Sequence, residues 1–186
     1  AFDKAEDRGD ECVHVHETIL AVAQAGGADG AVGLHLAAHF GLPYAFASHF
    51  APRLLMQALT VYRSQFRPSA TLARPHVVVG VPLIAAPTDE EAQFLASSTH
   101  QRVLGLLRGE RGAMPPPVPH FLAGLSPSER AGIEGFLAAA VIGGPDTVRQ
   151  GLQALVQATQ ADELMLVCDI FDPDLRLRSL DIAAVQ

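Results

Sequence analysis

Tryptophan is absent from this sequence of 186 residues, cysteine occurs only twice, and no segment is rich in Lys or Arg. Cys12 and Cys168 lie far apart and form no disulfide framework, so we expect a reducing, cytoplasmic location. The 20 Asp and Glu outnumber the 13 Lys and Arg, which gives a formal net charge of −7 at pH 7. Negative charge without a basic patch disfavours nucleic acid as a partner.

A long apolar run is also missing. The longest such stretch, residues 133–142, contains Glu134 and is too short to span a bilayer, so we expect no membrane partner. The charged N-terminus, residues 1–8, lacks the apolar core of a signal peptide. The chain begins with Ala1 rather than Met, as a processed, trimmed or partial chain would. Its length and its apolar content of 49% suffice for one domain with a hydrophobic core.

Apolar runs and helix-start signals alternate along most of the chain. Three runs predict buried strands, at residues 44–49, 76–85 and 164–168. Helices are expected to begin near five residues: Pro52, Thr88, Ser126, Pro145 and Asp172. This alternation predicts an α/β fold with a parallel sheet. Because a closed (β/α)8 barrel needs eight strands, three strands indicate either a small open sheet or a part of a barrel.

Three local patterns complete the expected secondary structure. Residues 17–25 favour a helix over a strand, and the helix that begins near Ser126 is expected to continue as far as Gly143. Pro82 interrupts the run 76–85 and cannot donate a hydrogen bond to a neighbouring strand. It therefore predicts a bulge or the end of regular pairing.

A possible metal site lies near the N-terminus. Cys12, His14 and His16 would share one face of a strand, as the ligands of a metal ion could. Short patterns of this kind are common, however, and no fourth ligand follows at a recognisable spacing. We therefore favour a solvated polar edge and predict no metal site.

From Leu36 onward, segments of the chain resemble the luciferase-like flavin monooxygenases. The best marked of them is the run at residues 41–52, GLPYAFASHFAP. The matching segments follow the family's order and are residues 36–52, 62–69, 85–92, 143–148 and 161–165. The resemblance implies a partial (β/α)8 TIM barrel, made of the C-terminal strands and helices of the family fold. Residues 31–186 would be this barrel portion, and residues 1–30 a diverged N-terminal segment.

The family chemistry uses reduced flavin mononucleotide (FMN) and O2. One oxygen atom enters a small organic substrate and the other leaves as water, while a separate flavin reductase can supply the reduced flavin. An alternative is a non-catalytic half-barrel or assembly module. Because a half-barrel leaves two sheet edges unpaired, it would dimerise into a homo-oligomer or complement a separate N-terminal half.

The resemblance also singles out candidate site residues. Barrel enzymes place their active sites at the carboxyl ends of the strands, so Ser48, His49 and Phe50 should face the pocket. His49 is the candidate catalytic residue, either as a hydrogen-bond partner of the flavin or as a general acid or base. Ser48 and Phe50 are candidate cofactor contacts. A structural interpretation, in which His49 only caps the end of its strand, remains open.

Two further strand ends are assigned by the same reasoning. In the family, a turn before the helix that contains Leu36 holds the flavin phosphate, and Gly30 occupies that place here. Asp29 beside it would repel an anion, since a helix N-terminus binds phosphate through free amides and positive potential. At the last strand we favour structural roles for Asp169 and Asp172, because Asp172 is explained as a helix cap.

Overall fold

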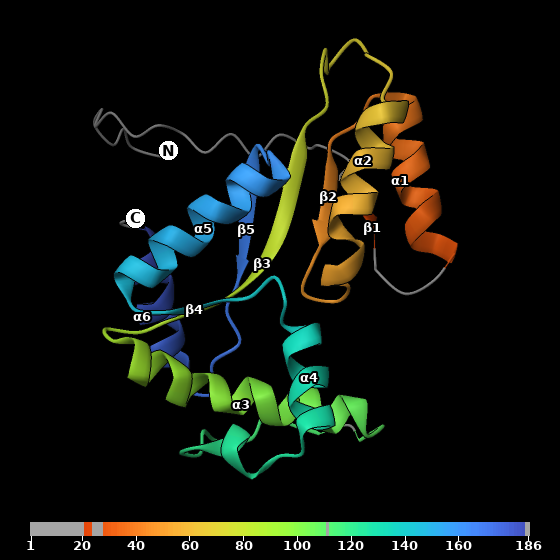
Figure 1. Cartoon of the computed structure of the whole chain (residues 1–186). Helices are drawn as coiled ribbons and strands as arrows, with labels where there is room; N and C mark the ends of the chain where they lie inside the picture. The colour runs from red at the N-terminus through yellow and green to blue at the C-terminus, as the bar shows by residue number, and fades with distance from the viewer. Residues whose placement is uncertain (1–20, 24–27, 111, 185–186) are drawn as a thin grey trace, which may run out of the picture.

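Parallel strands paired in one sheet organise this chain (Figure 1). The computed structural model describes residues 21–23, 28–110 and 112–184. The strands are β1 (Ala21–Ala23), β2 (Tyr44–Ala47), β3 (Val77–Ala85), β4 (Val141–Gly143) and β5 (Glu163–Val167). The helices are α1 (Ala28–Phe40), α2 (Leu55–Gln65), α3 (Asp89–Leu107), α4 (Pro127–Phe136), α5 (Pro145–Thr159) and α6 (Pro173–Ala184), with short 3-10 turns at Pro52–Leu54 and Phe121–Gly124. The predicted α/β class with a parallel sheet is confirmed.

Strand β3 is the centre of the sheet and has three neighbours. Val78 pairs with Ala45 of β2 and with Glu163 of β5, so these two strands occupy its two edges. β1 pairs with the far side of β2, and β4 pairs with the last three residues of β3. Pro82 is the last residue of β3 that pairs with β5, immediately before the pairing with β4 begins. The proline therefore lies where β3 exchanges one neighbour for another.

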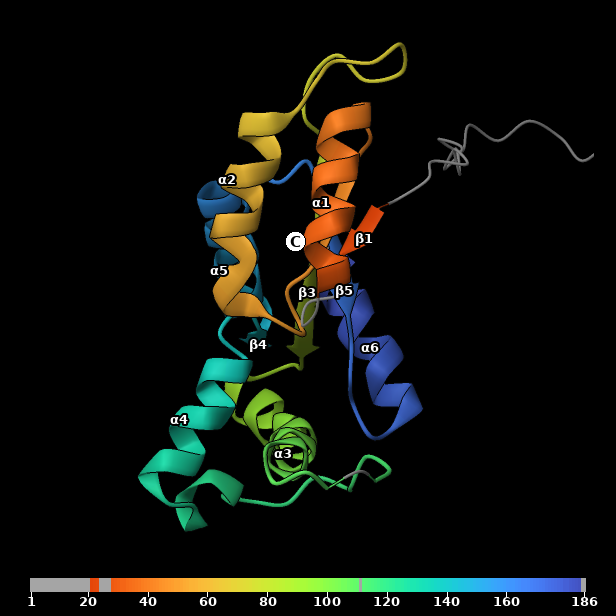
Figure 2. The ribbon, with the colours of Figure 1, turned by 90° about the vertical axis from the view of Figure 1, so that its right-hand side faces the viewer.

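Because all the strand pairs are parallel, their carboxyl ends share one edge of the sheet. Helices α3 and α4 lie beyond this edge, at the bottom of Figure 1, and Figure 2 shows α3 beyond the arrowhead of β3. Arg108 of α3 pairs with Glu129 of α4 and joins the two helices. They form a layer across the ends of the strands.

The two faces of the sheet have different surroundings. Alternate residues of β3 point to opposite faces, and one set, Val77, Val79, Val81, Leu83 and Ala85, is fully buried. This set forms the main core with aromatic residues of β2 and apolar residues of α1, α2, α5 and α6. On the other face Gly80 of β3 pairs with Met165 of β5, whose side chain is 54% exposed.

The turn between α1 and β2 requires glycine. Gly41 has φ +63°, and a Cβ atom there would lie 2.4 Å from the carbonyl oxygen of Arg67. The amide of Arg67 in turn donates to the carbonyl of Ala38, and the Ser69 hydroxyl donates to the carbonyl of Gly41. The segment after α2 is thus packed against this turn, and β2 starts from a fixed point.

Three expectations from the sequence need correction or comment. Residues 21–23 form the strand β1, although a helix was expected over residues 17–25. A strand of three residues is too short for its pattern of apolar residues to be recognised in the sequence. The helix from Ser126 ends at Phe136, and β4 follows it at residues 141–143 as a strand that was not predicted. Helix α1 starts at Ala28 and continues through residue 30, the expected end of the N-terminal segment.

A membrane-spanning helix and a metal-binding cluster are both absent from the described residues. Among the described helices, none has the length and apolar character to cross a membrane. In the same part of the chain, no group of three or more His, Cys, Asp and Glu could hold a metal ion. The metal-ligand candidates Cys12, His14 and His16 lie outside the described residues.

Candidate functional site

A cavity of ≈ 210 Å³ lies at the carboxyl ends of the strands, and we call it the strand-end cavity. Its walls come from the turn after β2, from β3, β4 and β5, and from α3 and α4. Most of its lining residues are apolar, among them Phe50, Leu83, Ile84, Leu106, Phe136 and Ile142. The polar ones are His49, Thr99, Arg102 and Asp169. A mainly apolar cavity with a few polar groups is typical of a small-molecule site.

The turn that follows β2 positions His49. Ser48 is fully buried, and its hydroxyl donates a hydrogen bond of 2.5 Å to the carbonyl oxygen of Gly80 in β3. This bond joins the turn to the centre of the sheet, and the Ser48 side chain does not line the cavity. Phe50 lies at the rim, 57% exposed, with its ring 4.2 Å from that of His49.

His49 packs directly against β3 at Gly80, a residue without a side chain. A Cβ atom at Gly80 would lie 3.2 Å from Nδ1 of His49, so any larger residue would press on the imidazole. The Nδ1 atom is buried and has no hydrogen-bond partner in the described part of the chain. Burial lowers the pKa of His49, and Arg102 lowers it further, while Asp169 opposes both. His49 is therefore neutral at neutral pH, with a free ring nitrogen.

An ion pair forms another part of the cavity wall. Arg102 of α3 pairs with the carboxylate of Asp169, which follows β5, and Thr99 donates a hydrogen bond of 2.9 Å to the Asp169 carbonyl. Thr99 and Arg102 are three residues apart, so they lie on one side of α3. The Nε atom of Arg102 is buried and lacks a partner among the described residues.

The sequence did not indicate Arg102, and it assigned Asp169 only a structural role. A basic residue on a helix is common, and only contact with a residue far along the chain distinguishes this one. The structural role expected for Asp172 is confirmed, because its carboxylate accepts hydrogen bonds from the amides of Asp174 and Leu175 at 2.8 and 3.1 Å.

Gly30 lies in the first turn of α1, beside Asp29. Since α1 follows β1, and β1 runs parallel to β2, the start of α1 lies at the same edge of the sheet as the turn that contains His49. The structure thus brings the three residues of that turn together at one strand end, and Gly30 belongs to a neighbouring strand end.

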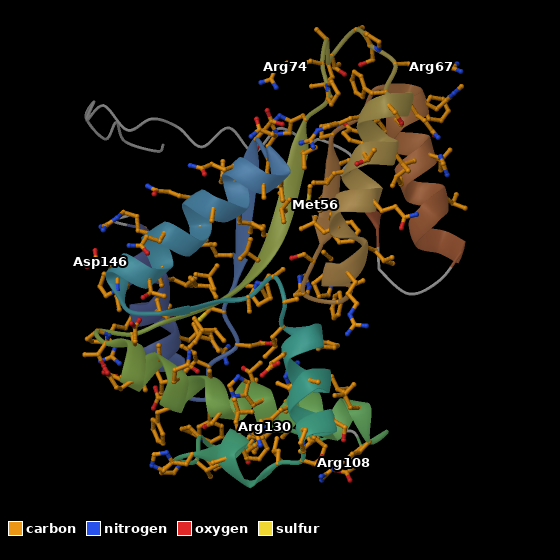
Figure 3. The ribbon with its side chains drawn as sticks, in the orientation of Figure 1. Met56, Arg67, Arg74, Arg108, Arg130 and Asp146 are labelled. Carbon is orange, nitrogen blue, oxygen red and sulfur yellow. The ribbon has the colours of Figure 1, made fainter. Side chains whose placement is uncertain are left out.

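Polar side chains also gather at the amino ends of the strands. Asp162 pairs with Arg74 and accepts a hydrogen bond of 2.9 Å from the amide of Val77, while His76 lies 2.7 Å from Glu163. Figure 3 shows Arg74 at the end of the molecule opposite Arg108. In parallel α/β folds this end contributes to stability, so we assign no site there.

No family model matches the chain, but comparison with known proteins gives similar sequences and structures. A luciferase-like monooxygenase of Escherichia coli (strain K12) is 46% identical over 148 residues, which are 80% of this chain and 44% of that protein. The solved structure of apo-MsnO8 is 30% identical with a TM-score of 0.67, over 83% of this chain and 47% of the other.

A more distant structure shares only the fold. It is the oxygenating constituent of 3,6-diketocamphane monooxygenase of Pseudomonas putida, a type II Baeyer-Villiger monooxygenase in complex with FMN. It is 19% identical with a TM-score of 0.51, over 82% of this chain and 45% of that chain.

The chain spans about half the length of the relatives that it matches. The expected partial barrel is confirmed, since the parallel sheet and its helices superpose on about half of each of these two structures. Over four-fifths of its length the chain is thus 46% identical to a luciferase-like monooxygenase, and it shares the fold of half of such an enzyme.

Proposed function

We propose that this chain provides half of the active site of a flavin-dependent monooxygenase, which uses reduced FMN and O2 to insert one oxygen atom into a small organic substrate. The observation that carries the proposal is the strand-end cavity, a mainly apolar cavity at the carboxyl ends of the strands that His49 lines. Barrel enzymes use this edge of the sheet for catalysis. Residues 31–186 would be the barrel portion, acting in the cytoplasm with a flavin reductase as partner.

The described residues fit the ring system of a flavin better than its phosphate. Apolar walls, and an imidazole whose Nδ1 has no partner among the described residues, suit a flat, mostly apolar ring with polar edges. Phe50 at the rim and His49 beside Gly80 would hold the ring. For the phosphate the available group is the first turn of α1 with Gly30, where helix amides attract an anion.

When bound, reduced flavin supplies the electrons that activate O2. The chain's own residues orient the reactants and exclude water, since most of the cavity wall is apolar. A neutral His49 can donate or accept a proton at its free nitrogen, and a pKa held below 6.5 keeps it in that state at neutral pH. Ser48 acts through His49, because its bond to the Gly80 carbonyl holds the turn in place.

The proposal is tested by titrating the purified chain into FMN and recording the flavin fluorescence. We expect saturable quenching, weaker by about tenfold in His49→Gln, because one ring contact is lost. His39→Gln is the matched control, since His39 is exposed on α1 and does not line the cavity. Absence of quenching at millimolar chain would contradict flavin binding by this chain.

A second candidate function is the assembly module, which the sheet itself favours. Among the described strands, β1 and β5 each have one edge without a partner. Met165 of β5 is exposed on the face of the sheet that lies opposite the main core, which we call the inner face. Such edges pair readily with another chain. A homo-oligomer that closes the sheet would appear in sedimentation, whereas a monodisperse monomer would count against it.

A further inference from the structure

A second cavity lies on the side of α3 opposite the strand-end cavity, and we call it the outer groove. Its volume is ≈ 580 Å³, and the segment 118–123 forms one of its walls. The other wall is α3, through Asp89, Glu90, Gln93, Phe94, Ser97 and His100. Thr99, Arg102 and Leu106 line the strand-end cavity instead, so the two sets lie on opposite sides of the helix. Figure 1 shows the segment 118–123 on the side of α3 that faces away from the strands.

Hydrogen bonds within the chain hold the outer groove in shape. The Ser97 hydroxyl accepts a bond of 2.8 Å from the amide of Val118, and the Gln101 side chain donates one of 2.9 Å to the carbonyl of Pro116. The prolines of this segment restrict its backbone further. The groove is therefore preformed, as small-molecule sites usually are.

One end of the outer groove is acidic. Asp89 and Glu90 lie there, and the groove lining contains neither Lys nor Arg. The Gly144 amide, and then the Thr147 hydroxyl, hold the pKa of Asp89 below its usual value, so Asp89 is ionised at neutral pH. Glu90 is exposed and has no ion-pair partner in the part of the chain that the structure describes. This end favours a cation.

His100 lies at the other end of the groove and is only 5% exposed. Burial lowers the pKa of His100, so the ring is neutral at neutral pH and does not offset the two carboxylates. Of its ring nitrogens, only Nδ1 belongs to the buried atoms without a partner. The Nε2 atom also lacks a hydrogen bond to any described residue, and it is the nitrogen open to the groove. A ligand can bond to it there.

The middle of the groove is apolar. Phe94 follows Glu90 by one helical turn, which places their Cβ atoms about 6 Å apart on one side of α3. The Phe94 side chain is 40% exposed, and Phe121 and Leu122 lie on the opposite wall. A flat apolar group packs well on such a ring. His100 follows Glu90 at about 15 Å along the helix axis, so a ligand that contacts both residues is extended.

We propose that the outer groove binds an extended organic amine. Its ammonium group lies at Asp89 and Glu90, its flat apolar part packs on Phe94, and a polar group at its far end forms a hydrogen bond with Nε2 of His100. The inference is independent of the proposed function, because the outer groove and the strand-end cavity share no lining residue.

The test uses four probes that share a benzene ring and a two-carbon chain. Tyramine has both the ammonium and the far hydroxyl, tyrosol lacks the charge, phloretate reverses the charge, and phenethylamine lacks the hydroxyl on the ring. Binding to the flavin-free chain is followed by NMR, with the ring resonances of His100 as the reporter.

We expect tyramine to bind about threefold to fivefold more tightly than tyrosol, as an ion pair with exposed carboxylates provides. Raising the ionic strength to about 1 M should remove this difference, since salt screens exposed charges. Phloretate should bind more weakly than tyrosol. Phenethylamine should bind about threefold more weakly than tyramine, and should shift the His100 resonances less, because one hydrogen bond is missing.

Variants separate the charge from the apolar contact, and both substituted residues are exposed, so the fold should be kept. Glu90→Gln should weaken tyramine by about threefold and leave tyrosol unchanged. Phe94→Ala should weaken both probes by about fivefold, because the ring contact is lost. Glu134→Gln is the matched control, since Glu134 is exposed on α4 and does not line the groove.

Equal affinity for tyramine and tyrosol would overturn the inference, and so would tighter binding of phloretate, equal effects of Glu90→Gln and Glu134→Gln, or no binding of any probe. FMN quenching, recorded on the same samples, should be unchanged by saturating tyramine. Competition between the two would place the amine in the strand-end cavity and overturn the inference as well. A chain that binds tyramine as described but does not quench FMN would remove the flavin and leave the outer groove assigned.

Discussion

At the scale of single residues, His49 combines the most physical influences. Burial and Arg102 favour the neutral imidazole, and Asp169 favours the protonated one. Since Arg102 and Asp169 are paired, their effects on His49 largely oppose each other, and burial decides the outcome. Gly80 determines how closely the ring approaches β3, and Ser48 holds the turn that carries it. The state of this one side chain therefore depends on three segments of the chain.

The first prediction is that Asp169→Asn lowers the pKa of His49 further. The substitution removes the carboxylate that raises this pKa and leaves Arg102 without its partner, so both changes disfavour the imidazolium. NMR titration of the ring protons, assigned with His49→Gln, gives the pKa in both proteins. In both, the unfolded chain binds this proton more readily than the folded one, so the contribution of neutral His49 to stability is lost as the pH falls below about 6.5. A pKa that rises in Asp169→Asn would contradict the assigned directions.

At the scale of elements, the connection between α1 and β2 controls where the site's strand begins. Gly41 combines a positive φ with a close approach to the backbone of the segment after α2. A few residues later, β2 passes through the core at Tyr44 and Phe46 and ends in the turn of His49. Displacement of Gly41 would thus be transmitted along a short, buried strand to the cavity.

We predict that Gly41→Ala lowers the free energy of unfolding by about 2 kcal/mol or more, since strain at positive φ adds to a steric clash. Gly33→Ala is the matched control: Gly33 lies in α1 with nothing within 4 Å of its Cβ position, so alanine should raise the free energy by up to about 1 kcal/mol. Urea denaturation followed by circular dichroism measures both. Similar stability of the two variants would refute the role assigned to the turn.

The elements also show what the sequence can and cannot predict. The β-branched run of β3 and the capping residues Thr88 and Ser126 are local signals, and both caps are present in the structure. β4 was not predicted, because its three residues follow α4 and the apolar pattern continues between the two without a break. Arg102 was not recognised as a site residue for another reason. Its partner Asp169 is 67 residues away along the chain, and only the tertiary fold brings the two together.

At the scale of the whole molecule, the sheet is covered unequally. Helices α1, α2, α5 and α6 contribute to the core on one face. In β5, Leu164 and Leu166 pack against that core. Met165 lies between them, points to the other face of the sheet and is exposed. An exposed methionine beside a strand edge without a partner is a surface that a second copy of the chain can cover.

We therefore predict that the isolated chain self-associates through this inner face, and that Met165→Glu weakens the association by at least about fivefold, because a carboxylate would have to be buried at the contact. Leu177→Glu serves as the control, since Leu177 is 63% exposed and belongs to α6 and not to a strand. Sedimentation velocity over a range of concentrations gives the dissociation constant for each protein. Because both substitutions add one negative charge to an exposed site, a difference between them reports the location of the contact and not the net charge. A wild-type chain that stays monomeric at every concentration, or equal weakening by both substitutions, would show that the inner face of the sheet is not where copies of this chain meet.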